Sequence, residues 1–208
     1  MKLSDVCLAV LLAAVGPASL PALAGPATPA ADAAVPCDHP RNLVANCGFE
    51  NGDPPTGWPG WGARSRDGSM PHSGSYSLRI ESQIFGDDVP LAFADSNCFP
   101  VGPRVPHLFG VAVRVASTTT PVACGSIFLT YAAAGCSGAF LAEDSVGIVP
   151  SAPTGWVPVQ KRVAASSGRI SARLQLQCRG GDPGDAFTVH FDDAFAEIIE
   201  VVFVDGFE

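Results

Sequence analysis

The chain has 208 residues, of which 47% are hydrophobic and only 15% are charged, so a chain that is disordered throughout is excluded. Its 22 glycines and 19 prolines predict many turns and few charged helices, which favours an all-β protein. The formal net charge of -8 disfavours nucleic acids and anionic membranes as partners, because both select basic surfaces.

The N-terminus has the pattern of a secretory signal peptide over residues 1–24. Lys2 precedes an apolar run from Val6 to Val15, and Ala22-Leu23-Ala24 provides the small residues of a cleavage site. A retained membrane anchor is the alternative, and no other segment approaches the roughly 20 apolar residues that a span requires. We therefore expect a protein that is exported to the periplasm, the cell surface or the medium.

The rest of the chain divides into three parts by composition. Residues 25–36 are rich in Ala and Pro and predict an irregular leader. Residues 37–200 contain the patterned sequence and are expected to fold as one domain, because the chain is too short for two ordinary ones. Residues 201–208 are expected to form a short C-terminal tail.

Removal of the signal peptide, which contains Cys7, leaves an even number of cysteines. They are Cys37, Cys47, Cys98, Cys124, Cys136 and Cys178. Six cysteines in an exported chain predict disulfide bonds, for which fifteen pairings exist. Short loops favour Cys37–Cys47 and Cys124–Cys136, which leaves Cys98–Cys178. A zinc site is the alternative, although the sequence contains no C-x-x-C pair.

Alternation of apolar and polar residues predicts a series of strands along the domain. In chain order the runs are 76–81, 109–116, 127–131, 157–163, 169–179 and 187–191. The clearest is 169–179, in which one face is apolar from Ile170 to Cys178 and the other is polar. Clusters of Gly, Pro, Asn and Asp separate the runs. We therefore predict a jelly-roll β-sandwich of about eight antiparallel strands in two sheets.

Four blocks of the sequence resemble those of a known family. They are NLVANCGFENG…GWPGWG at 42–62, HSGSYSLRI at 72–80, TGWVPV at 154–159 and FTVHFDDAFAE at 187–197. In this order they look like the galactose-binding-like β-sandwich of the carbohydrate-binding modules that are attached to xylanases and cellulases. The resemblance implies non-catalytic binding of a polysaccharide or glycan. An extracellular or surface module for protein interaction, on the same fold but without sugar specificity, is the alternative.

The resemblance also implies a structural calcium ion where the first and last strands meet. The residues that match the family's ligands are Glu50, Asp192 and the segment His72–Ser75, with the backbone of Gly48 as a further candidate. Ca²⁺ prefers such a mixture of carboxylate and carbonyl oxygens. Neighbouring strand residues point to opposite faces, so only one acid of the Asp192–Asp193 pair can face the ion. We favour Asp192, and Asp193 remains the alternative.

Sugar recognition needs aromatic faces with polar groups around them. Trp61 is the first candidate platform, because both of its neighbours in the sequence are glycine, and Tyr131 is the second. Polar candidates lie on one face of the strand predicted at 169–179, namely Arg173, Gln175 and Gln177. Trp58 and Trp156 are expected to pack against the core.

No pattern in the sequence supports catalysis. The chain contains no G-x-S-x-G nucleophile elbow and no H-E-x-x-H zinc motif. Its 4 histidines are scattered singly, and nothing in the sequence places two acids across a cleft, as glycoside hydrolysis would require. We therefore expect a non-catalytic, monomeric, exported protein.

Overall fold

The computed structural model describes residues 37, 39–85, 89–164, 166–182 and 184–199. These residues contain twelve β-strands, joined by turns and loops, and no helix. The strands are β1 (Gly60–Trp61), β2 (Ala63–Asp67), β3 (Ser77–Glu81), β4 (Gln83–Phe85), β5 (Val89–Asp95), β6 (Phe99–Pro100), β7 (His107–Thr118), β8 (Val122–Ala133), β9 (Ser137–Ile148), β10 (Val157–Val163), β11 (Ser171–Gly180) and β12 (Phe187–Ile198). Nowhere in these ranges is there a helix long and apolar enough to cross a membrane. The predicted signal peptide, leader and C-terminal tail lie outside the described residues.

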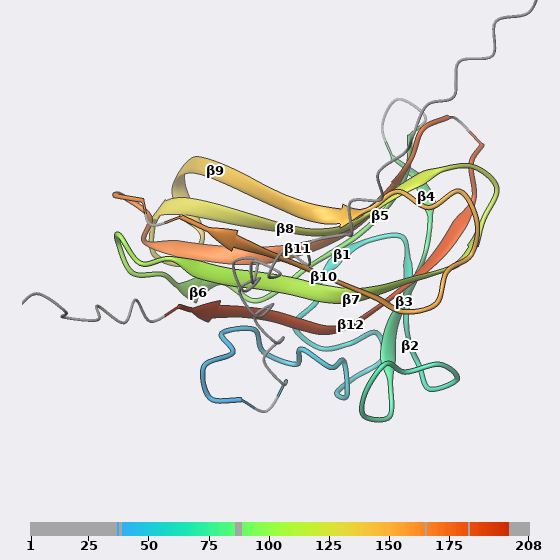
Figure 1. The fold of residues 1–208 in the computed structure, drawn as a ribbon, viewed down its shortest axis with the longest axis horizontal. Coiled ribbons are helices and arrows are strands. Elements are labelled where there is room, and N and C mark those ends of the chain that lie inside the picture. The colour runs from blue at the N-terminus through green and yellow to red at the C-terminus, as the bar shows by residue number, and fades with distance from the viewer. Residues whose placement is uncertain (1–36, 38, 86–88, 165, 183, 200–208) are drawn as a thin grey trace, which may run out of the picture. The chain divides into compact units, whose positions relative to one another are not determined.

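The strands form two antiparallel sheets, with β8 and β9 in one layer and β7 and β12 in the other (Figure 1). The seven-stranded sheet has the order β1-β5-β11-β8-β9, with β4 also paired to β5 and β6 to β11. The five-stranded sheet has the order β10-β7-β12-β3-β2. The predicted all-β sandwich is therefore confirmed, but with about twelve strands instead of eight. Several of the additional strands, such as β1 and β6, have only two residues, which is too short for a recognisable alternation.

The hydrophobic core lies between the two sheets and follows the predicted alternation. On β11 the buried apolar residues are Ala172, Leu174, Leu176 and Cys178. Ile170, which the same pattern placed with them, is 41% exposed because it precedes the strand. The five-stranded sheet contributes Leu78, Ile80, Phe109, Val111, Val113, Val115, Phe187, Val189 and Phe191. Removing these side chains from water is the main force that holds the sheets together.

Three disulfide bonds join Cys37 to Cys47, Cys98 to Cys136 and Cys124 to Cys178. The Cys37–Cys47 pairing agrees with the preference for short loops, whereas the pairings Cys124–Cys136 and Cys98–Cys178 are wrong. The register of the sheet explains the difference. Cys124 and Cys178 are direct partners across β8 and β11, and both side chains are buried. Strand pairing thus brings together two residues that are 54 apart in sequence.

Candidate functional site

A β-bulge in β12 gives two neighbouring acids different surroundings. Between Asp192 and Phe195, β12 advances by one residue more than its partner β7, and Asp193 has a φ of 49°. The extra residue reverses which positions face the core, so that Ala194 and Ala196 are buried after the bulge. Asp192 is fully buried, whereas the side chain of Asp193 is 20% exposed. In a regular strand without the bulge, Ala194 and Ala196 would face away from the core.

Both acids bind the loop that leads into β3. Asp192 Oδ2 accepts hydrogen bonds from the backbone N–H groups of His72 at 2.8 Å and Ser73 at 3.1 Å. Asp193 contacts the side chains of the same residues, with Oδ2 at 2.6 Å from His72 Nδ1 and Oδ1 accepting from Ser73 Oγ at 2.5 Å. The bulge therefore presents one carboxylate to the backbone of the loop and the other to its side chains.

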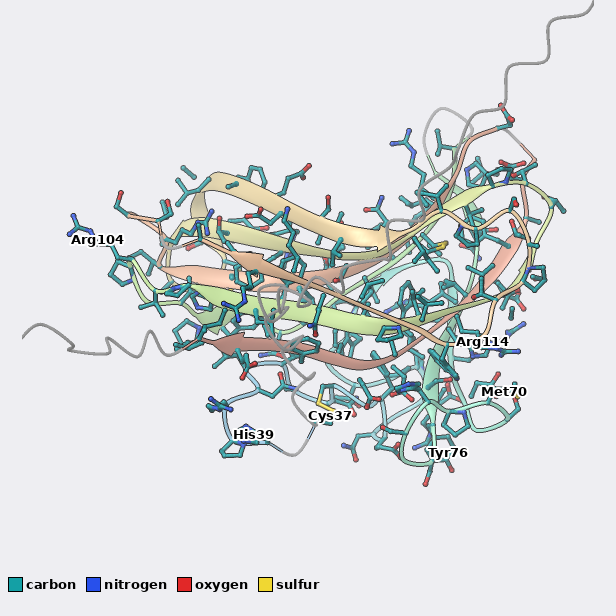
Figure 2. All side chains as sticks on the ribbon, in the orientation of Figure 1. Cys37, His39, Met70, Tyr76, Arg104 and Arg114 are labelled. Carbon is teal, nitrogen blue, oxygen red and sulfur yellow. A yellow bond between two sulfur atoms is a disulfide. The ribbon has the colours of Figure 1, made fainter. Side chains whose placement is uncertain are left out.

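Glu50 reaches the same loop from the opening segment. Its Oε1 atom accepts hydrogen bonds from the backbone N–H groups of Ser75 at 2.8 Å and Tyr76 at 3.1 Å. Gly74 adopts a φ of 59°, which favours glycine, and a Cβ atom there would overlap Glu50 Oε1, so a larger residue would displace this carboxylate from the turn. Figure 2 shows Tyr76 and Met70 on this loop.

The structure thus brings together all the residues predicted for the metal. A Cβ atom placed on Gly48 would lie 3.9 Å from Asp192 Oδ1 and 3.9 Å from Glu50 Cγ, so the two acids flank that glycine. In the described part of the chain, no three side chains of His, Cys, Asp or Glu are arranged to hold a metal. Further ligands at this place would be backbone or neutral side-chain oxygens or water, and such a set of hard oxygen donors suits Ca²⁺.

Burial raises the pKa of Asp192 from 3.8 to about 6, because the ionised carboxylate loses its hydration. The N–H groups of Ser73, Asp193 and His72 partly oppose this shift, and the charge of Asp193 adds to it. A cation beside Asp192 would stabilise the ionised form, so the electrostatics of this carboxylate favour a cation as a neighbour.

The second group of predicted residues lies on the outer face of the seven-stranded sheet, which is the side away from the core. A single row of cross-strand partners crosses all five strands of the main order. The row is Trp61, Phe93, Gln177, Gly125 and Gly147. Trp61 is 38% exposed at one end, and the two glycines leave the other end without side chains. Along the row, the exposed indole of Trp61 is followed by the amide of Gln177 and then by the backbone of the two glycines.

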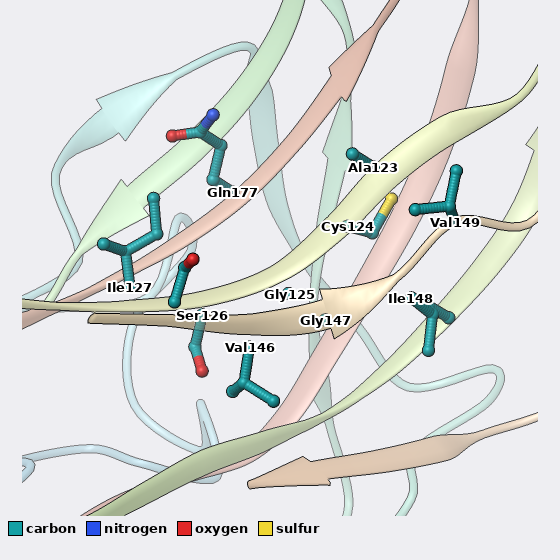
Figure 3. A pocket seen from close by; sticks show the side chains of 11 residues that line it. Ala123, Cys124, Gly125, Ser126, Ile127, Val146, Gly147, Ile148, Val149 and Gln177 are labelled. Atoms are coloured by element: carbon teal, nitrogen blue, oxygen red, sulfur yellow. The ribbon is translucent and has the colours of Figure 1, made fainter. Parts of the chain in front are cut away.

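The two glycines form the floor of a pocket of about 300 Å³. Figure 3 shows Gln177 and Ile127 rising on one side of the sheet, whereas Val146 and Ile148 point to the other. A Cβ atom on Gly125 would overlap the carbonyl oxygen of Val146, so the close approach of β8 and β9 requires glycine at this position. The lining of the pocket thus combines the backbone of two glycines with apolar side chains and the amide of Gln177.

The other predicted polar residues form a hydrogen-bonded group beside this row. Gln175 and Asp95 are partners across β11 and β5, and Gln175 Nε2 donates to Asp95 Oδ1 at 2.8 Å. Arg173 Nη1 lies 3.4 Å from Asp95 Oδ2, and its guanidinium carbon lies 5.7 Å from the ring centre of Tyr131. Trp61, Tyr131, Arg173, Gln175 and Gln177 therefore all lie on one face, as ligand-binding residues on a sheet would require.

The sequence interpretation missed Asp95, Phe93 and the two glycines. Residues 89–95 do alternate between half-buried and buried positions, but Pro90 and two alanines hide the pattern. The glycines belong to strands whose pairing no local pattern reveals, so their proximity could only come from the structure.

The two remaining tryptophans lie elsewhere. Trp58 is buried, packs against Phe49 with tilted rings whose centres are 5.0 Å apart, and donates from Nε1 to the carbonyl of Asn46 at 3.0 Å, which confirms its predicted packing in the core. Trp156 is half-buried and packs edge-on against His72 and His190, at 5.4 and 6.4 Å. It covers the outer face of the five-stranded sheet and does not contact the candidate sugar face.

One arrangement on the five-stranded sheet superficially resembles a catalytic triad. Ser77 Oγ lies 3.2 Å from His190 Nδ1, and Asp67 Oδ2 lies 3.9 Å from His190 Nε2. Ser77 is fully buried, so a substrate cannot reach its hydroxyl, and the contact of the acid exceeds hydrogen-bond length. The group is therefore a packing feature of β3 and β12.

Comparison with known proteins supports the fold and no closer kinship. No protein-family model matches the sequence, and no curated protein matches it. Among solved structures, a family 61 carbohydrate-binding module in complex with β-1,4-galactotriose is similar, with a TM-score of 0.50, 20% identity, and coverage of 76% of this chain and 99% of that one. A family 16 carbohydrate-binding module has a TM-score of 0.53, 16% identity, and coverage of 76% and 100%.

Larger proteins contain the same fold as one part. The enzymatically active domain of tailspike protein 4 from bacteriophage CBA120 has a TM-score of 0.54 and 15% identity, and the match covers 76% of this chain but only 22% of the tailspike. The chain therefore has the β-sandwich fold of carbohydrate-binding modules, as the sequence blocks predicted.

Proposed function

We propose that the protein is a non-catalytic module that binds a polysaccharide or glycan across the outer face of the seven-stranded sheet. The observation that carries this proposal is the row from Trp61 to Gly147, in which an exposed indole lies beside a polar amide and a bare backbone floor. Sugar rings present apolar C–H faces and hydroxyl edges, and this surface offers a partner for each. Modules of the same fold, one of them solved with a bound galactotriose, support the proposal.

We also propose that Glu50 and Asp192 hold a structural Ca²⁺, completed by backbone oxygens of the segment His72–Ser75 and of Gly48. The ion would join the opening segment, the loop before β3 and the bulge of β12. Its charge would offset the cost of burying Asp192. The three disulfide bonds support export to an oxidising compartment, for which residues 1–24 would be the signal.

The proposed binding function can be tested by affinity electrophoresis of the purified protein. Gels are cast with xylan, β-glucan, mannan, β-1,4-galactan, pectin or a soluble chitin derivative, and Trp61→Ala is run beside the wild type. Trp61 is 38% exposed, which corresponds to roughly 90 Å² of indole surface and to about 2 kcal/mol if a ligand covers it. We expect retardation of the wild type by at least one polysaccharide, and an approximately 30-fold higher dissociation constant for the variant.

Met70→Ala is the matched control, because Met70 is an exposed apolar residue on a loop that precedes β3 in the other sheet. It should be retarded like the wild type. Absence of retardation in every gel would contradict the proposal, and so would equal retardation of Trp61→Ala and wild type.

One observation favours a protein-interaction module as the second candidate. Strand β9 forms an edge of its sheet and carries two consecutive exposed apolar residues, Phe140 and Leu141. Edge strands can pair with an added strand from another protein. Lack of retardation by all polysaccharides, together with loss of a protein partner in Phe140→Ala, would move the assignment to this candidate.

A further inference from the structure

Two aromatic groups lie on the outer face of the seven-stranded sheet, at opposite corners. Trp61 and Phe93 are cross-strand partners on β1 and β5. Tyr131 and Phe140 are cross-strand partners on β8 and β9, with ring centres 5.9 Å apart in an edge-to-face arrangement. Phe140 is 54% exposed and Trp61 is 38% exposed, so each group presents one exposed aromatic side chain.

The strand register gives the separation of the two groups. Phe93 lies level with Gln177 of β11, and Tyr131 lies level with Ser171 of the same strand. Six residues of extended chain separate these levels, and four strand spacings separate β1 from β9, so Trp61 and Phe140 are about 20 Å apart along the strands and about 20 Å apart across them. A monosaccharide or disaccharide is too short to contact both.

The surface between the groups is polar and electrically balanced. Its charged residues, taken from the strand positions that the structure describes on this face, are Arg173, Arg179, Asp95 and Glu143. Two positive and two negative side chains give no net charge, and Arg173 is already paired with Asp95. With a net charge of -8 on the whole chain, this face offers no attraction to a polyanion.

Both aromatic groups include an edge strand of the sheet, since β1 and β9 end the strand order. A ligand that contacts Trp61 and Phe140 therefore crosses the sheet from edge to edge, so a longer chain can continue past the sheet at both ends.

We propose that the two aromatic groups are the end subsites of one binding path, and that the ligand is the interior of an uncharged, linear polysaccharide. This inference rests on the proposed function and specifies its ligand. Tyr131 and Phe140 provide the far platform, and Asp95, oriented by Gln175 and Arg173, accepts hydrogen bonds from sugar hydroxyls on the path between them.

The test is isothermal titration of the purified protein with xylo-, cello-, manno- and β-1,4-galacto-oligosaccharides from the disaccharide to the hexasaccharide. We expect the affinity in the responding series to rise by roughly tenfold or more between the trisaccharide and the hexasaccharide, as the second platform becomes covered. Phe140→Ala should remove that gain and leave trisaccharide binding unchanged, whereas Trp61→Ala should weaken both. Polygalacturonate should not bind, and the hexasaccharide affinity should be insensitive to salt.

A plateau at the trisaccharide, or a wild-type hexasaccharide affinity in Phe140→Ala, would overturn the extended path and leave the proposed function intact. Binding of polygalacturonate that weakens with salt would overturn the uncharged ligand. Lack of binding to every oligosaccharide and every polysaccharide would overturn this inference together with the proposed function. Ile84→Ala serves as the control, because Ile84 is exposed but pairs with the buried Pro90 and so lies off the face.

Discussion

Replacement of Asp192 by asparagine should stabilise the protein without calcium and destabilise it relative to the wild type with calcium. Asp192 is fully buried, and its pKa is raised from 3.8 to about 6. One pKa unit corresponds to about 1.4 kcal/mol, so the ionised carboxylate costs about 3 kcal/mol above pH 7 in the absence of a cation. Asparagine keeps an acceptor for the His72 and Ser73 N–H groups but loses the Oδ1 acceptor for Asp193, which costs about 1 kcal/mol.

The net expectation is that Asp192→Asn is about 2 kcal/mol more stable than the wild type in EGTA at pH 8. The sign follows from the direction of the shift. Because the pKa of the folded state lies above that of the unfolded state, the stabilising contribution of Asp192 is full below pH 3.8 and is lost as the pH rises through about 6. The advantage of the variant should therefore appear across this interval and be absent near pH 3.

The assay is urea unfolding followed by tryptophan fluorescence, in EGTA and in millimolar CaCl₂, for wild type, Asp192→Asn and Asp193→Asn. Calcium should stabilise the wild type by mass action, and this gain should be lost in Asp192→Asn and kept in Asp193→Asn. A less stable Asp192→Asn in EGTA at pH 8 would refute the argument from the buried charge. An equal stability of the wild type with and without calcium would refute the metal site.

Three further predictions concern other parts of the molecule. Gly74→Ala should lose at least 1 kcal/mol and bind calcium more weakly, because it has a φ of 59° and its Cβ would overlap Glu50 Oε1; urea unfolding and calcium titration measure both effects. His107 is buried and burial lowers its pKa, so stability should fall as the pH drops below 6.5, and this slope should be smaller in His107→Phe. Removal of the Cys98–Cys136 bond by a double serine variant should cost about 4 kcal/mol for a loop of 38 residues, and peptide mapping without reductant should recover this pair.

The alternation of apolar residues was sufficient to predict the sandwich and the polar face of β11, because a half-buried strand repeats every two residues whatever its neighbours are. It was insufficient wherever the pairing of strands decides which residues meet. Cys124 meets Cys178 because β8 and β11 share a register over ten residues, and loop length contains no information on that register.

The candidate metal site shows the same division. Glu50, the turn at 72–75 and the paired acids could be named from the sequence blocks, and the structure brings them together. The surroundings of Asp193 could not be derived from alternation, because the extra residue of the bulge changes the side of every position that follows Asp192. Phe93, Gly125 and Gly147 were missed for a related reason, since β5 and β8 meet only through β11, which is distant from both in the sequence.

The opening segment joins the two sites, which raises the question of whether calcium should control sugar binding. Glu50 and Trp61 are eleven residues apart, but Trp58 between them is buried and held by hydrogen bonds to Asn46 and from Arg64. Beyond it, the Asp95 N–H donates to the carbonyl of Pro59 at 2.7 Å, and Trp61 pairs with Phe93.

The position of Trp61 is therefore set by the core and by β5, and not by the loop that would hold the ion. We expect EGTA to lower the unfolding midpoint without changing the dissociation constant for a polysaccharide at a temperature where the protein stays folded. The measurement is titration with the retarding polysaccharide in EGTA and in CaCl₂, with circular dichroism as the control for folding. A weaker affinity in EGTA with an unchanged spectrum would show that calcium orders the indole platform, and would place the ion within the binding mechanism.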